Sequence, residues 1–104
     1  MSLRAPGQYA NPGKTTDGLG LLDYEIAAEK AAALGRAGER VERSLAELST
    51  FEGNADDRVV VLKRAAEAVY GYFIQRELCG MRRHQDVIRE YQIPNEVLVR
   101  LGAK

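Results

Sequence analysis

The sequence has no tryptophan, one cysteine, one histidine and three prolines among its 104 residues. Because Cys79 is alone, the chain cannot form an intrachain disulfide or complete a cysteine-based zinc site. The chain also has no net charge, since fifteen Lys and Arg residues balance fifteen Asp and Glu residues. Without a net field to attract an anionic polymer, nucleic acid is not expected as a partner, and any electropositive site must be local.

Long apolar runs are missing as well. No stretch approaches the roughly 18 apolar residues that a membrane span needs, and the first residues show no signal-like apolar segment. With the single cysteine, this predicts a cytoplasmic protein that does not associate with membranes. A chain this short buries only about 60 to 65 per cent of its unfolded surface when it folds alone, so a marginal core is expected.

The first seventeen residues differ in composition from the rest. They include two of the three prolines together with glycine, asparagine and threonine, and they show neither helical nor strand periodicity. We therefore predict a flexible N-terminal arm over residues 1–17, followed by a single helical domain over residues 18–104.

From about residue 19, apolar or small side chains recur in alternating steps of three and four. The members of this first seam are Tyr24, Ala27, Ala31, Leu34, Gly38, Val41, Leu45 and Leu48. Such spacing predicts a long amphipathic helix with a heptad-like contact line. The opposite face carries charged residues four apart, such as Glu39 and Arg43, which is typical of a solvated surface.

Residues 49–54 predict a tight connection to a second helix. Gly53 is free to take the left-handed conformation, and Asn54 is placed to cap the next helix. A connection this short forces an antiparallel hairpin. The second helix has its own seam, formed by Val59, Leu62, Ala66, Val69 and Phe73. An adjacent apolar stripe consists of Tyr70, Ile74, Leu78 and Met81.

The remaining residues predict shorter elements. Gly80 can either bend or end the second helix. Pro94 is well placed as the first residue of a short C-terminal helix, because its fixed φ suits that position, and Gly102 would end that helix. Val97, Leu98 and Leu101 would share one face.

The predicted fold is therefore all-α, a long antiparallel helical hairpin with a short C-terminal helix. Two stripes on the second helix suggest two packing partners, and a lone hairpin leaves the stripe through Ile74 and Leu78 partly exposed. Contiguous apolar patches of this kind usually mark an interface. We expect a homodimer that forms a four-helix-bundle-like assembly.

The densest polar cluster lies between residues 75 and 84. It contains the candidate ligand-binding residues Arg76, Glu77, Arg82, Arg83 and His84. Guanidinium groups offer paired donors that match phosphate or carboxylate. The neighbouring carboxylates of Glu77 and Asp86 favour instead an ordinary ion-pair network.

Catalysis and metal binding find less support in the same cluster. On a continuous helix Cys79 and His84 point about 140 degrees apart, so the histidine cannot act as a base for the thiol unless the chain breaks at Gly80. One histidine with Glu77 and Asp86 does not match a known local metal spacing. We assign no catalytic residue, metal ligand or cofactor.

Three stretches carry a resemblance to a known family: Leu22–Lys30, Tyr72–Gly80 and Ile93–Gly102. They resemble segments of a family of short uncharacterised proteobacterial proteins, over about residues 20–102. The resemblance implies a helical fold and a bacterial cytoplasmic origin, and it transfers no activity, ligand or catalytic residue.

The leading interpretation is a non-enzymatic, oligomeric protein-interaction or scaffold module, whose bundle surface or N-terminal arm recognises an unidentified protein. The alternative is a regulator that binds an anionic ligand or nucleic acid through the Arg cluster. A third class, an enzyme or metalloprotein centred on Glu77, Cys79 and His84, is the least supported by the pattern.

Overall fold

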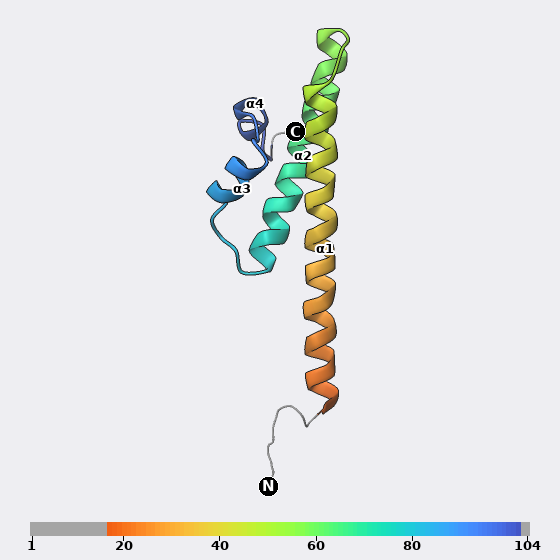
Figure 1. The fold of residues 1–104 in the computed structure, drawn as a ribbon, viewed down its shortest axis with the longest axis vertical. Helices are drawn as coiled ribbons and strands as arrows, with labels where there is room; N and C mark the ends of the chain where they lie inside the picture. The colour runs from red at the N-terminus through yellow and green to blue at the C-terminus, as the bar shows by residue number, and fades with distance from the viewer. Residues whose placement is uncertain (1–16, 103–104) are drawn as a thin grey trace. The chain divides into compact units, whose positions relative to one another are not determined.

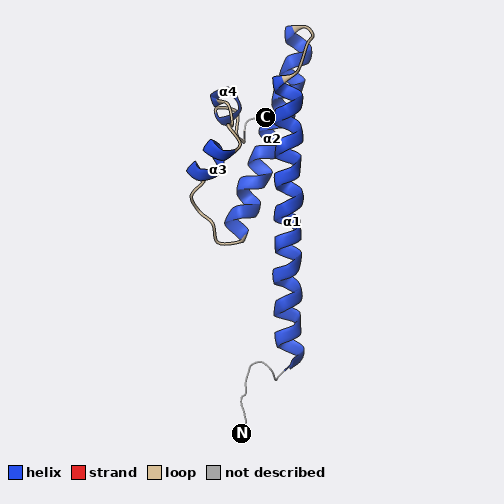
Figure 2. Cartoon of the chain, viewed as in Figure 1, coloured by secondary structure: helices blue, strands red, loops and turns tan. Residues whose placement is uncertain are grey.

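The computed structural model describes residues 17–102, which form four α-helices and no strand (Figures 1 and 2). The helices are α1 (Asp17–Ser49), α2 (Ala55–Leu78), α3 (Gln85–Glu90) and α4 (Asn95–Leu98). The all-α prediction with two long helices is confirmed, and a second short helix, α3, precedes the expected C-terminal one. Apart from Asp17, the predicted N-terminal arm lies outside the described residues.

The described part of the chain divides into two units, residues 17–32 and residues 33–102. Helix α1 contributes to both. We call residues 17–32 the N-terminal half of α1 and residues 33–49 its C-terminal half. Within the second unit, helices α2, α3 and α4 accompany the C-terminal half of α1.

Helix α2 begins as the sequence predicts. The Oδ1 atom of Asn54 accepts a hydrogen bond of 2.8 Å from the backbone N–H of Asp57. Asp56 and Asp57 then occupy the first turn, where the helix dipole favours negative charge. Gly53 does not use the left-handed conformation that was open to it, since positive φ occurs among the described residues at Gly80, Gly102 and Gln92.

Gly53 has a different physical role in the connection. A Cβ atom at this position would lie 2.7 Å from Cζ of the Phe51 ring, so the ring folds over the glycine. Phe51 in turn packs against the hydrophobic core. Glycine is therefore needed here for close approach of a side chain and not for an unusual backbone angle.

Helix α2 runs antiparallel to the C-terminal half of α1. Near the connection, Glu47 and Arg64 form an ion pair of 3.2 Å. Farther from the connection, a Cβ on Gly38 would lie 3.5 Å from the Tyr72 ring and 3.1 Å from the Tyr91 hydroxyl. Gly38 thus lets two tyrosines approach the backbone of α1.

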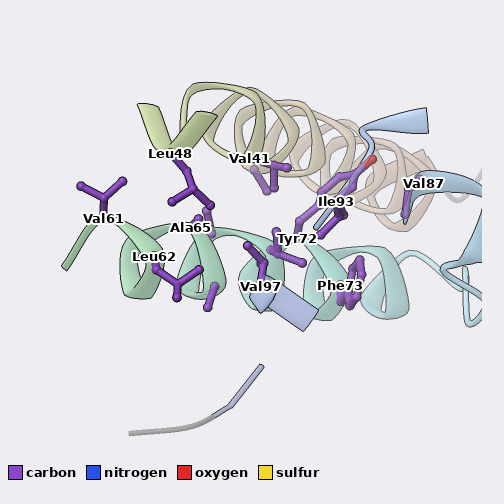
Figure 3. Packing of buried hydrophobic residues seen from close by; sticks show 14 residues of the cluster. Val41, Leu48, Val61, Leu62, Ala65, Tyr72, Phe73, Val87, Ile93 and Val97 are labelled. Carbon is purple, nitrogen blue, oxygen red and sulfur yellow. The ribbon is translucent and has the colours of Figure 1, made fainter. Parts of the chain in front are cut away.

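The core draws on α1, α2 and the C-terminal segment, and Figure 3 shows its side chains. Its members are Ala37, Val41, Leu48, Val61, Leu62, Ala65, Ala66, Ala68, Val69, Tyr72, Phe73, Val87, Ile93 and Val97. Val41, Val69 and Val97 have no exposed surface. Over half of the core side chains come from α2, so α2 is its central element.

The buried face of α2 is wider than the predicted seam and is placed differently. Four of the five predicted seam residues are buried, while Val59 is exposed. The second buried stripe is Val61, Ala65, Ala68 and Tyr72. Helix α4 packs on α2 and supplies a second neighbour from within the chain. The stripe of Tyr70, Ile74 and Leu78 is left exposed.

Gly80 ends α2. Its φ is +89°, its N–H donates to the carbonyl of Glu77 at 3.0 Å, and the N–H of Met81 donates to the carbonyl of Arg76 at 2.9 Å. These two bonds define a Schellman motif, in which a left-handed residue satisfies the last helical carbonyls. The chain therefore reverses here instead of continuing as a bent helix.

Helix α4 is held by apolar and ionic contacts. Val97 is fully buried, while Leu98 and Leu101 are partly buried against the core, as their shared face predicts. Pro94 lies one position earlier than predicted, as the N-cap, and Gly102 has a φ of +75°. Arg58 of α2 holds Glu96 of α4 through two hydrogen bonds.

Candidate functional site

Three of the five predicted ligand-binding residues meet at the C-terminal end of α2. The Nε atom of Arg76 donates to Nδ1 of His84 at 3.2 Å, and Nε2 of His84 lies 3.0 Å from Oε2 of Glu77. The Nη2 atom of Arg76 also donates to the backbone carbonyl of Arg83 at 2.8 Å. We call Arg76, Glu77 and His84 the α2-end network.

The geometry fixes the protonation pattern of the imidazole. A guanidinium can only donate, so Nδ1 of His84 must accept the bond from Arg76. The ring proton of the neutral imidazole then sits on Nε2 and is donated to Glu77. Both ring nitrogens are engaged by neighbours within the chain.

Apolar packing also fixes the imidazole. The ring of His84 stacks on the ring of Phe73, with centroids 4.2 Å apart and an interplanar angle of 2°. Only 15% of the His84 side chain is exposed. The guanidinium of Arg76 lies over the Tyr72 ring, 5.9 Å from its centroid. The network thus ties the loop after Gly80 back onto α2 and sets where α3 begins.

The other two predicted site residues lie elsewhere. Arg82 and Arg83 are exposed on the loop between α2 and α3, and only the backbone of Arg83 joins the network. The ligand-binding role of the five residues stays a prediction. In the range 17–102, no group of three or more His, Cys, Asp and Glu side chains is arranged to hold a metal ion.

Cys79 caps the C-terminus of α2 and is half-buried. The break at Gly80 removes the angular objection to a Cys79–His84 pair, because the two residues no longer share a helix. However, His84 already uses both ring nitrogens toward Arg76 and Glu77. His84 is therefore not available as a base for Cys79.

A tyrosine pair forms a second notable feature, which the sequence analysis did not predict. Tyr72 and Tyr91 pack edge to face, with centroids 5.7 Å apart and an angle of 83°. Burial raises the pKa of Tyr91 to about 12, and the hydrogen bond with Tyr72 and the negative charges of Glu42 and Glu90 act in the same direction. Tyr91 therefore stays neutral at physiological pH. Gly38 in the first seam was the signal that a large side chain would approach there.

The ion pair of Arg58 and Glu96 was also missed, because the two residues lie far apart in the sequence. The guanidinium donates from Nη1 to Oε1 at 3.0 Å and from Nη2 to Oε2 at 2.8 Å. These hydrogen bonds hold the pKa of the Glu96 carboxyl below its usual value and raise the pKa of the Arg58 guanidinium. Such a paired contact is directional, so it fixes the orientation of α4 on α2.

Apolar side chains are exposed in two places. On α2, Tyr70, Ile74 and Leu78 follow one another at four-residue steps and are 47%, 40% and 60% exposed. On the N-terminal half of α1, every side chain from residue 20 to residue 32 is exposed. The large apolar members there are Leu21, Leu22, Tyr24 and Ile26.

These features define a small all-helical protein in which the histidine, Arg76 and Glu77 are bound to one another and in which two helices expose large apolar side chains. The chain belongs to the Family of unknown function (DUF6665), whose model matches residues 1–104. This membership confirms the resemblance to an uncharacterised family. A comparison with curated proteins and another with solved structures each found no match. None of the described helices is apolar over a sufficient length to cross a bilayer.

Proposed function

We propose that the protein is a non-enzymatic, self-associating helical module that binds protein surfaces. The observation that carries this proposal is the exposure of large apolar side chains in two places, on the N-terminal half of α1 and on α2. Scattered apolar residues on a surface are ordinary, but Tyr70, Ile74 and Leu78 of α2 follow one another at four-residue steps and form a contiguous strip. Contiguous strips of this kind usually mark contacts with another chain.

The polar cluster supports the same proposal. A site that binds a small anion needs donors directed at the ligand, whereas Arg76 directs two of its donors at His84 and at the Arg83 carbonyl. Glu77 and His84 likewise satisfy one another. This arrangement favours a structural role for the cluster.

Two modes of self-association follow from the two exposed regions. A four-helix-bundle-like dimer would bury Tyr70, Ile74 and Leu78 of α2 against a second copy. Alternatively, the N-terminal half of α1 would pair with a second copy. Both modes share one consequence, a dimer whose formation removes apolar surface from water.

The test is the mass of the particle as a function of concentration. Sedimentation velocity and multi-angle light scattering of the full chain, from about 0.1 to 100 µM, should show a monomer that converts to a dimer, as expected for a micromolar association. Helicity by circular dichroism should fall on dilution. A monomer of unchanged helicity throughout that range would contradict the proposal.

A further inference from the structure

We propose that the N-terminal half of α1 is the self-association surface and that it pairs antiparallel with the same segment of a second copy, around a two-fold axis between residues 25 and 26. This inference rests on the proposed function, since it names the surface that associates. It commits to one occupant of the exposed helix face, a second copy of this chain.

The first argument is the continuity of the seam. In the C-terminal half of α1, the seam residues Gly38, Val41 and Leu48 are buried by the core. The same three-four spacing continues toward the N-terminus through Ala31, Ala27, Tyr24 and Gly20, where every side chain is exposed. A pattern that serves as a packing line in one half of a helix is equally suited to packing in the other.

The second argument is the stability of the segment. A helix gains most of its stability from packing an apolar face, and residues without such packing depend on intrinsic propensity alone. Gly18 and Gly20 both weaken this segment, because glycine is a poor helix former. With every side chain from residue 20 to residue 32 exposed, the segment needs a partner more than α2 does, since α2 already buries one wide face.

The third argument is the match in side-chain size. With the axis between residues 25 and 26, Tyr24 of one copy faces Ala27 of the second copy, and Gly20 faces Ala31. The largest seam residue therefore meets a small one, and small residues elsewhere let the helices approach. A parallel pair would instead set Tyr24 against Tyr24 and Ala27 against Ala27, which crowds one layer and leaves the next one loose.

The fourth argument is charge complementarity. Asp23 and Lys30 flank the seam on the same side, at equivalent heptad positions, and both are exposed. In the antiparallel pair, Asp23 of one copy lies beside Lys30 of the second copy, and symmetry provides this contact twice. A parallel pair would place them beside the uncharged Ala28 and Gly35. Charge of this kind selects orientation more than it adds affinity.

The first experiment compares two tyrosines of the same exposed class. Tyr24→Glu is expected to raise the dimer dissociation constant at least about a hundredfold, because it would bury a carboxylate in the interface. Tyr70→Glu on α2 is the matched control and should leave the dissociation constant within about threefold. Far-ultraviolet circular dichroism at high concentration checks that both variants retain α2 and the core.

The second experiment tests orientation with disulfides in a Cys79→Ser background. Gly20→Cys and Ala31→Cys chains should crosslink to each other on mixing under mild oxidation, since these positions face one another in the antiparallel pair. Neither variant should crosslink efficiently to itself. Self-crosslinking of Ala31→Cys alone would show a parallel pair and overturn the assignment.

A charge swap gives an independent check. Asp23→Lys and Lys30→Asp should each weaken the dimer, by up to about tenfold, while the double swap restores it. If Tyr70→Glu abolishes the dimer and Tyr24→Glu does not, this inference is wrong and the proposed self-association stands. If the natural chain is monomeric throughout, both fail.

Discussion

The two halves of helix α1 carry the same apolar spacing and differ completely in burial. In the C-terminal half, Val41 has no exposed surface and Leu48 is 5% exposed. In the N-terminal half, Leu21 is 60% and Tyr24 is 72% exposed. The comparison teaches that helical periodicity identifies a face that is suited to packing, but it does not identify which chain supplies the neighbour.

The difference has a physical origin in what each half can bury. Next to Gly38 the C-terminal half meets Tyr72 and Tyr91, whose rings fill the space that a larger residue would occupy. The N-terminal half is rich in alanine, which removes little apolar area from water when it packs. Tyr24, the largest residue of its seam, gains free energy only when a partner covers it, so association and helix stability are coupled in this segment.

The largest expected effect comes from replacing a leucine by alanine in each half of α1 and comparing the two losses of stability. Leu48→Ala should lower the free energy of unfolding by about 2 to 5 kcal/mol, because it leaves a cavity in the core. Leu21→Ala should change the stability of the core by less than about 0.5 kcal/mol, because this leucine is exposed. Urea unfolding followed by circular dichroism at low protein concentration measures both. Equal losses would show that the N-terminal half already packs within one chain.

An effect of intermediate size on stability is expected when a side chain is added at Gly38, where α1 becomes buried. Gly38→Gln should destabilise the protein by about 1 to 3 kcal/mol, because a Cβ there already lies 3.1 Å from the Tyr91 hydroxyl. Gly35→Gln is the matched control, since a Cβ at Gly35 meets nothing within 4 Å. It should instead stabilise the helix by up to about 1 kcal/mol, because glutamine is the better helix former. Thermal unfolding should therefore shift in opposite directions for the two variants.

Much of the fold could be predicted from local signals. The cap at Asn54, the two long helices and the shared face of Val97 and Leu101 all depend on residues close in sequence, and the structure contains them. The break at Gly80 was left open, because the left-handed φ of this residue depends on the bonds to Arg76 and Glu77 that form only when the helix stops.

The errors arise from contacts between distant residues. The second apolar stripe on α2 was predicted through Tyr70, Ile74 and Leu78, but the stripe that is buried is Val61, Ala65, Ala68 and Tyr72. Tyr72 of this stripe contacts Gly38 of α1. Of the candidate site, the sequence analysis placed Arg76, Glu77 and His84 in one polar cluster. The donor from Arg76 and the stacking on Phe73 were not foreseen, since both depend on how the loop after α2 folds back.

The smallest expected effect concerns the ion pair that joins α4 to α2. The Arg58 hydrogen bonds hold the pKa of Glu96 below its usual value. A carboxyl whose pKa is lower in the folded state contributes stability above its unfolded pKa of about 4.3, and this contribution is lost as the pH falls through the folded value. Glu96→Gln should therefore lower the unfolding temperature slightly at pH 7 and have less effect near pH 3. Because both partners are 42% exposed, solvent screens the pair and keeps the effect small.

A double-mutant cycle with Arg58→Gln measures the coupling between the two side chains at each pH. A coupling that persists unchanged at pH 3 would contradict this account. The helicity of the N-terminal half of α1 should not respond to either variant, since neither residue belongs to that unit.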